Sequence, residues 1–86
     1  MSYELYTLPN CEHCQEAKRF LNESGITYEE INLGNSQGQK RFQPLYKDNR
    51  DKIGRDNHGV VLPVLVESGD SEITRIVQGE EIKQLF

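Results

Sequence analysis

The feature that most constrains this chain is the segment from Pro9 to Cys14, where an apolar, strand-like run gives way to a helical pattern. The segment holds both cysteines of the protein, Cys11 and Cys14, in the spacing Cys-x-x-Cys. Residues 3–8 alternate enough to predict a strand. After the segment, small and apolar residues recur at helical spacing, which predicts a helix over about residues 12–24. The two thiols should therefore lie where a strand passes into the N-terminus of a helix.

This position gives the two sulfurs different environments. Unpaired backbone N–H groups at a helix start favour an anionic sulfur, so we expect a lowered pKa for Cys11. Cys14 falls one turn deeper, on a helix face of small and apolar residues, and should be sheltered. That face consists of Cys14, Ala17, Leu21 and Ser24, joined by Phe20. One exposed and one sheltered sulfur suffice for thiol–disulfide exchange, in which the first attacks a disulfide and the second resolves the mixed disulfide.

Length and composition narrow the class of protein. A chain of 86 residues predicts a single domain over residues 1–86 with a small core. No apolar run approaches the length of a membrane span and no signal-peptide pattern is present, so we expect a cytoplasmic protein without a membrane partner. Two cysteines three positions apart in a reducing compartment favour redox or metal chemistry over a structural disulfide framework. We also expect a monomer.

Charge argues against one class of partner and leaves another open. The net charge of −4 disfavours general nucleic-acid binding. Between residues 40 and 55, however, six cations face only two acids. The cations are Lys40, Arg41, Lys47, Arg50, Lys52 and Arg55, and the acids are Asp48 and Asp51. This segment is either a solvated helix face and loop or a docking surface for an acidic partner or anionic substrate.

Beyond the first helix, Gly25 suits the left-handed position that ends a helix, and residues 26–33 predict a second strand, parallel to the first. A turn over residues 34–36 then precedes a helix over about residues 37–49. Pro44 lies inside that helix, which predicts a late start or a bend.

Residues 48–59 predict a loop or a short irregular helix. Val60–Val66 predicts one buried strand in which Pro63 demands an edge, a bulge or a cis peptide. Residues 68–70 predict a hairpin turn, residues 72–77 an antiparallel strand and residues 79–86 a terminal helix.

These elements predict an α/β fold with the order β-α-β-α-β-β-α, packed as one mixed four-stranded sheet flanked by helices. The predicted core gathers the apolar positions of every element. Its members are Leu5, Tyr6, Leu8, Phe20, Leu21, Ile26, Ile31, Phe42, Leu45, residues 60–66, Ile73, Ile76 and Val77.

The chain resembles the thioredoxin fold and, more closely, the glutaredoxins and glutaredoxin-like proteins. Four segments across nearly the whole chain carry the resemblance. They are Tyr6-Thr7-Leu8-Pro9-Asn10-Cys11 with Cys14, Ala17-Lys18 with Phe20-Leu21, Leu62-Pro63, and Gly79-Glu80-Glu81. The first of these segments is the most specific.

The resemblance implies roles for particular residues. Cys11 would be the nucleophile and Cys14 the resolving thiol. Pro63 would be cis, and Leu62 would offer its backbone to glutathione or to the extended chain of a partner. Glu80 and Glu81, in the first turn of the predicted terminal helix, loosely match the family segment that binds the amino group of glutathione. On the second helix, Gln43 with Gln39 and Lys40 could reach a substrate carboxylate in this fold, or the three could form a solvated helix face.

The chain also departs from the family pattern near its cysteines. Leu8 replaces the usual lysine, which removes a cation that would hold a glutathione carboxylate. Glu12 and His13 replace the usual Pro-Tyr pair between the cysteines. Glu12 should oppose ionisation of Cys11, whereas a protonated His13 should favour it, so these two residues tune the thiol pKa in opposite directions. His13 could equally be a simple exposed residue of the first turn.

The resulting hypothesis is a thiol–disulfide oxidoreductase that reduces disulfide-containing proteins or glutathione mixed disulfides through a dithiol mechanism. Either glutathione, as a co-substrate, or thioredoxin reductase would return the electrons, and no tightly bound cofactor is expected. Leu8 favours the subgroup served by thioredoxin reductase.

Three alternatives stay open. The first is a non-catalytic dimer that holds an iron–sulfur cluster through Cys11. The second is a zinc site that uses both cysteines with His13 and His58, although a helix directs neighbouring side chains apart. The third is the arsenate-reductase-like branch of the fold, for which the chain looks too short.

Overall fold

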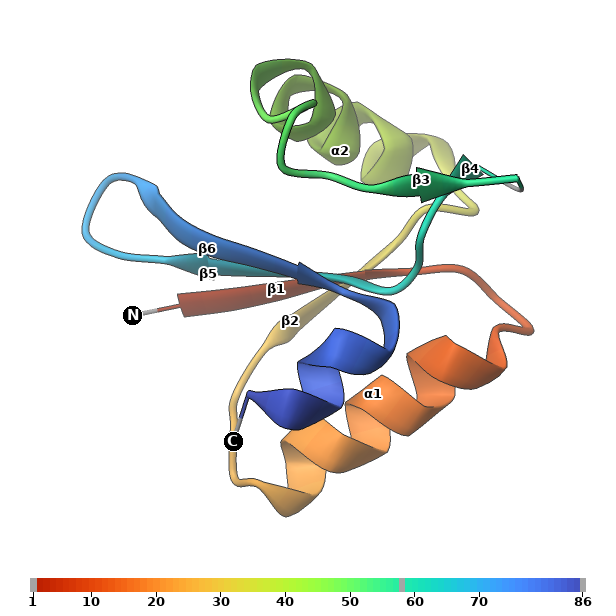
Figure 1. The fold of residues 1–86 in the computed structure, drawn as a ribbon, viewed down its shortest axis with the longest axis vertical. Coiled ribbons are helices and arrows are strands. Elements are labelled where there is room, and N and C mark those ends of the chain that lie inside the picture. Colours follow the sequence, from red (N-terminus) through yellow and green to blue (C-terminus); the bar gives the residue numbers. More distant parts are fainter. Residues whose placement is uncertain (1, 58, 86) are drawn as a thin grey trace.

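A four-stranded sheet forms the centre of the computed structural model, which describes residues 2–57 and 59–85 (Figure 1). The spatial order of its strands is β2-β1-β5-β6. The strands are β1 (Ser2–Thr7), β2 (Glu29–Asn32), β5 (Val64–Ser68) and β6 (Ile73–Gln78). β1 pairs with β2 in parallel, whereas the β1–β5 and β5–β6 pairs are antiparallel. The predicted mixed four-stranded sheet is therefore confirmed, and the connection through α1 (Glu12–Glu23) joins its one parallel pair.

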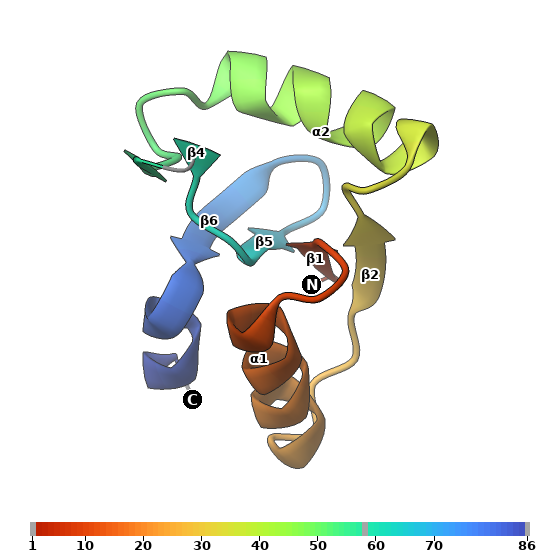
Figure 2. The ribbon, with the colours of Figure 1, turned by 90° about the vertical axis from the view of Figure 1, so that its right-hand side faces the viewer.

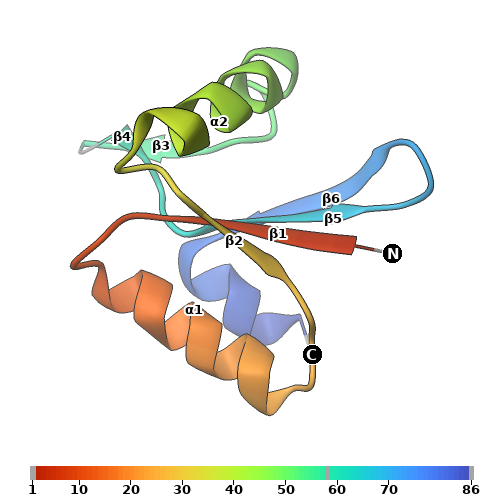
Figure 3. The ribbon, with the colours of Figure 1, turned by 180° about the vertical axis from the view of Figure 1, so that it is seen from behind.

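Helices cover both faces of this sheet. α1 and the 3-10 helix η1 (Gly79–Gln84) lie on one face, and α2 (Ser36–Asp48) lies on the other (Figures 2 and 3). The alternation of strand side chains supplies a separate apolar cluster to each face. On the α1 face the buried cluster is Leu5, Ala17, Leu21, Leu65, Val77 and Ile82. On the α2 face it is Tyr6, Ile31, Val64 and Val66, packed against half-buried Phe42 and Leu45 among others.

The start and end of α1 follow from local chemistry. Cys11 is the N-cap, with an extended backbone at φ −109° and ψ 111°. Gly25, which follows the C-cap Ser24, adopts φ 73°, as predicted for the residue that ends a helix. Cys14, Ala17 and Leu21 are buried, which confirms the predicted inward face. Ser24 is exposed, so its inclusion in that face was wrong, because the helix has already ended there.

α2 begins at Ser36 because Asn35 caps it, accepting a hydrogen bond of 2.8 Å from the Gly38 N–H. The predicted late start is therefore wrong, and the helix runs on through Pro44. Gly38 is the only buried residue that α2 contributes. A Cβ there would collide with the main-chain carbonyl of Asn32, so the close approach of α2 to the end of β2 requires glycine.

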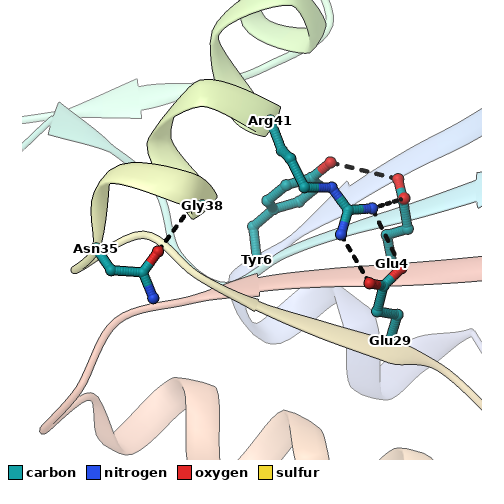
Figure 4. A network of polar contacts seen from close by, with 6 residues as sticks. All are labelled: Glu4, Tyr6, Glu29, Asn35, Gly38 and Arg41. Carbon is teal, nitrogen blue, oxygen red and sulfur yellow. Dashed lines mark hydrogen bonds and ion pairs between the residues drawn. The ribbon is translucent and has the colours of Figure 1, made fainter.

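Polar contacts fasten α2 to the sheet edge (Figure 4). The Arg41 guanidinium donates to Glu29 carboxylate oxygens at 2.7 and 3.1 Å and to the Glu4 carboxylate at 2.6 Å. Tyr6 donates to the other oxygen of Glu4 at 3.3 Å. The Arg41 hydrogen bond holds the pKa of Glu29 below its usual value, and burial raises the pKa of Tyr6 to about 12. We call Arg41, Glu4 and Glu29 the arginine clamp.

Several predicted boundaries need correction. The second strand covers Glu29–Asn32 and not residues 26–33, because Ile26 donates its N–H back to the Leu21 carbonyl at 2.9 Å after the helix. The run 60–66 is not one strand, since residues 61–63 interrupt it. The loop predicted over residues 48–59 contains part of a small antiparallel pair, β3 (Arg55–Asp56) with β4 (Gly59–Val60). The terminal helix is a 3-10 helix that ends at Gln84; Phe86 lies outside the described residues.

The predicted core also needs two changes. Leu8 is 40% exposed and does not belong to it, because β1 ends at Thr7 and the chain turns away there. Ile53 and Ile82, which the pattern missed, are buried at 4% and 0% exposure. No helix within residues 2–57 and 59–85 combines the length and apolar character needed to cross a membrane.

Candidate redox site

The two cysteines meet at the N-terminus of α1 and form a disulfide, with Cα atoms 5.2 Å apart. Cys14 is 1% exposed, whereas Cys11 is only half-buried. The Cys14 N–H donates to Cys11 Sγ at 3.1 Å, so a helix-start N–H points at the outer sulfur. The predicted contrast between an outer and an inner sulfur is therefore present in the structure.

The turn before Cys11 brings the outer sulfur to the surface. Asn10 has φ 59°, and asparagine tolerates this left-handed conformation better than most residues. The Leu33 N–H donates to the Thr7 carbonyl at 2.7 Å, which fixes the end of β1 against the residues after β2. Gly34 leaves room for the Pro9 ring, because a Cβ at Gly34 would lie 3.1 Å from Pro9 Cδ. These contacts anchor the start of the exposed turn against the residues that follow β2.

Residues 61–63 form a loop between β4 and β5, and the Leu62–Pro63 peptide bond is cis, as the resemblance implied. Pro63 is buried and Leu62 is half-buried. The Pro63 carbonyl accepts from the Gly79 N–H at 2.9 Å. The main-chain N–H and C=O of Leu62 form no hydrogen bond with another residue of the described chain. That edge of backbone is open to pairing with an extended peptide.

Gln78 holds this loop in place, a role that the sequence pattern did not reveal. Its side-chain amide donates to the carbonyls of Val61 and Gly54, both at 3.0 Å, and its amide oxygen accepts from the Gly54 N–H at 2.6 Å. A single amide thus joins the loop to the segment before β3. The only sequence signal was its position directly before Gly79, where the last strand ends.

A groove of about 380 Å³ runs from Leu8 to α2. Leu8 opens the turn that precedes Cys11, which we call the cysteine turn. The lining of the groove is mostly apolar and includes exposed Leu8 together with two amide side chains. The lining residues are Leu8, Leu33, Gln39, Phe42, Gln43, Val60 and Leu62. Of the predicted substrate contacts, the structure therefore brings Leu62 and Gln43 to one groove. No lysine or arginine lines it among the described residues.

The other predicted site residues do not line this groove. His13 is exposed on the first turn of α1, and its Nδ1 lies 3.8 Å from Oε1 of exposed Glu80 on η1. Glu12, the residue after Cys11, is exposed, and Glu81 is exposed on η1. The structure therefore pairs His13 with Glu80, and neither Glu80 nor Glu81 lines the groove with Gln43.

A second polar cluster connects α1 to the end of β1. Thr7 is 2% exposed and donates to the Glu30 carboxylate at 2.8 Å, and Lys18 donates to the same oxygen at 3.0 Å. Burial opposes ionisation of Glu30, yet the hydrogen bonds from Lys18 and Thr7 hold its pKa below the usual value. Lys18 lies one helical turn after Cys14. This cluster fixes α1 relative to the sheet edge.

Within residues 2–57 and 59–85, no group of three or more His, Cys, Asp and Glu side chains is placed to hold a metal ion. His58, which the zinc alternative needed, lies outside the described residues.

The chain is similar to known redox proteins. A family model described as glutaredoxin matches residues 3–66. Among solved structures, the thioredoxin-like protein BC3987 is 26% identical with a TM-score of 0.64, over 99% of this chain and 100% of that one. The glutaredoxin-like protein NrdH-redoxin from Escherichia coli is 25% identical with a TM-score of 0.60, over 100% and 96%.

A third structure supports the fold alone. A glutaredoxin from Archaeoglobus fulgidus is 20% identical with a TM-score of 0.60, over 98% of this chain and 84% of that one. No curated protein shows a significant sequence match. The fold is therefore thioredoxin-like, as the sequence predicted.

Proposed function

Because the chain belongs to the glutaredoxin family, we propose that it is a thiol–disulfide oxidoreductase that reduces disulfides in protein substrates through Cys11 and Cys14. One observation carries the proposal: Cys11 Sγ is the outer sulfur of a disulfide at a helix N-cap, and the Cys14 N–H points at it. In the reduced protein the same N–H would stabilise a thiolate.

Two exchange steps complete the reaction. The Cys11 thiolate attacks one sulfur of the substrate disulfide, forms a mixed disulfide and releases the first substrate thiolate. Cys14, once deprotonated, then attacks Cys11 Sγ, which breaks the mixed disulfide and releases the second substrate thiolate, and this thiolate takes its proton from solvent. The substrate gains two electrons, and the protein ends with the Cys11–Cys14 disulfide.

Substrate binding would use the open backbone of Leu62. An extended segment that carries the substrate cysteine could pair with its N–H and C=O, while neighbouring side chains of the substrate enter the groove that Gln43 and Leu8 line. Pro63 shapes this edge, and Glu80 pairs with His13, which lies between the two cysteines in the sequence. A reducing compartment, the cytoplasm, suits this chemistry.

We propose thioredoxin reductase as the electron donor in preference to glutathione. Leu8 presents an apolar side chain where a cation would meet a glutathione carboxylate, and no cation lines the described groove. The glutaredoxin-like protein NrdH-redoxin from Escherichia coli has a thioredoxin-like activity profile. Both observations favour a flavin-dependent reductase over glutathione.

The test compares two reducing systems on one disulfide substrate. NADPH with thioredoxin reductase should support turnover at least about tenfold faster than glutathione with its reductase, which corresponds to about 1.4 kcal/mol. Leu8→Lys should narrow that difference by restoring the cation, and Cys11→Ser should reduce both rates to background. Faster turnover with glutathione would contradict the proposed donor, and full activity of Cys11→Ser would contradict the nucleophile.

The iron–sulfur alternative has a separate test. A cluster held by Cys11 would absorb visible light, whereas a dithiol protein is colourless. Protein purified without oxygen should show no visible absorbance under the proposed function, and a stoichiometric iron–sulfur spectrum would favour the carrier.

A further inference from the structure

The exposed face of α2 carries cations next to the groove. Lys40, Gln43 and Lys47 are spaced by three and four residues, so they form one stripe along the helix. All three are exposed, and Gln43 itself lines the groove. Within the described chain neither lysine pairs with a carboxylate. Two free ammonium groups therefore flank a groove that contains no cation of its own.

Tyr46 continues this stripe along α2, and the guanidinium groups of two arginines lie over its ring. The Cζ atoms of Arg50 and Arg55 lie 5.8 and 5.9 Å from the centre of its ring, and Arg55 donates to the Tyr46 hydroxyl at 2.9 Å. Tyr46 in turn stacks on Phe42, with ring centres 5.9 Å apart, and Phe42 lines the groove. An aromatic pair thus connects the groove to two oriented guanidinium groups. We call Lys40, Lys47, Arg50 and Arg55 the cationic platform.

The cations of the platform differ from Arg41, the arginine of α2. Arg41 is occupied by Glu4 and Glu29 in the arginine clamp, so it fastens the helix and is not available to a partner. Lys52 adds a further cation to the segment, while Asp48, Asp51 and Asp56 lie in the same stretch and reduce its charge. Five available cations still exceed three acids in a chain whose net charge is −4.

This distribution of charge favours a short acidic partner over a long polyanion. A long polyanion would meet the excess negative charge of the rest of the surface, whereas a short acidic segment can contact the platform alone. The platform also continues the groove that begins at Leu8 beside the cysteine turn. A partner that lies along both the groove and the platform would have apolar or neutral residues near its own cysteine and acidic residues further along its own sequence.

We propose that the cationic platform, which extends from α2 to β3, docks an acidic segment of the disulfide-bearing protein substrate, which holds the substrate cysteine over the groove and against Cys11. This inference rests on the proposed thiol exchange and adds the chemical class of its substrate. Its contribution is to association, because exposed charges steer and hold a partner without touching the reacting sulfurs.

The experiment uses two synthetic peptides and the reduced protein in single turnover, so no reductase is needed. Both peptides contain the same internal Cys-Gly-Gly-Cys disulfide and a ten-residue Gly–Ser linker, followed by four Glu in one and four Gln in the other. Such a linker extends to about 33 Å, which spans the 32 Å longest dimension of the protein. The second-order rate of peptide reduction is measured at low and high salt.

The Glu peptide should react about five- to tenfold faster than the Gln peptide at 20 mM NaCl, and about equally fast at 0.5 M NaCl, because salt screens exposed charges. Lys47→Glu and Arg50→Glu should each lower the rate ratio by about two- to threefold. Arg19→Glu, which makes the same charge change at an exposed position of α1, should leave the ratio unchanged.

The outcomes separate this inference from the proposed function. If neither peptide is reduced, thiol exchange fails and the docking inference fails with it. If both are reduced at equal rates at low salt, only the docking inference is overturned. Polyglutamate should inhibit reduction of the Glu peptide, and stronger inhibition by a single-stranded oligonucleotide of equal charge would overturn the assignment to an acidic protein segment.

Discussion

The two faces of the central sheet are covered by helices that are held in different ways. α1 buries Cys14, Ala17 and Leu21 and packs with η1 over an apolar cluster. α2 buries only Gly38, and its attachment depends on half-buried aromatic and aliphatic side chains together with the arginine clamp. The first arrangement fixes the cysteines with respect to the sheet. The second leaves an open groove and a charged surface beside them, which is what a substrate-binding face requires.

The strongest test of this contrast compares one leucine from each face. Leu21→Ala on the α1 face should lower the free energy of unfolding by about 2–5 kcal/mol, because the side chain is fully buried. Leu45→Ala on α2 should cost less, since Leu45 is only half-buried. Urea denaturation of both variants measures the two losses. Equal losses would show that the faces are packed alike.

Gly38→Ala tests the close approach of α2 to β2. Alanine is the better helix former by about 1 kcal/mol, yet its Cβ would meet the Asn32 carbonyl, so we expect a net loss of about 1–3 kcal/mol. Gln37→Ala, an exposed neighbour on the same helix turn, should change stability by no more than about 0.5 kcal/mol. A stabilised Gly38→Ala protein would mean that α2 is free to move away from the strand.

Arg41→Met examines the arginine clamp. The guanidinium is well exposed, with 43% of its side chain accessible, so solvent weakens its ion pairs and we expect a loss below about 1 kcal/mol at pH 7. Chemical denaturation at low and at high salt measures the effect, which should shrink with salt. A loss as large as that of Leu21→Ala would place the clamp among the principal supports of the fold.

The clamp also makes stability depend on pH with a definite sign. The lowered pKa of Glu29 means that its pairing stabilises the folded state above the unfolded value of 4.5 and that this contribution is lost as pH falls through the lower folded value. Stability should therefore rise with pH across this acidic window. In Arg41→Met the rise of stability with pH should be smaller. An unchanged dependence of the unfolding free energy on pH would show that the Arg41–Glu29 pair does not cause it.

Local patterns predicted much of the fold because each strand and helix carries its own period. These patterns involve only residues that are close in sequence. Examples are the alternation in β1 and β6 and the helical spacing of Cys14, Ala17 and Leu21. The pattern failed at residues 61–63, where an apolar run looked like a continuous strand, since the break there depends on hydrogen bonds from Gln78. It also missed β3 and β4, which are too short to show a period.

The candidate site likewise has a local part that the sequence predicted and a part assembled from distant segments that it did not. The cysteine pair and its helix start are local, so the Cys-x-x-Cys spacing predicted them. The groove is assembled from four separate segments, and the pairing of His13 with Glu80 joins residues 67 positions apart, so neither could be read from spacing. Leu8 illustrates this limit of sequence patterns. Its apolar character predicted a core position, whereas β1 ends before it and leaves it exposed at the groove.

The proposed thiol exchange requires Cys11 to be the accessible nucleophile and Cys14 to be its sheltered partner. Limited alkylation of the reduced protein with iodoacetamide at pH 7, followed by mass spectrometry of the peptides, measures the reactivity of each thiol separately. Cys11 should be modified at least about tenfold faster than Cys14. Equal modification of the two cysteines, or modification of Cys14 first, would contradict the account.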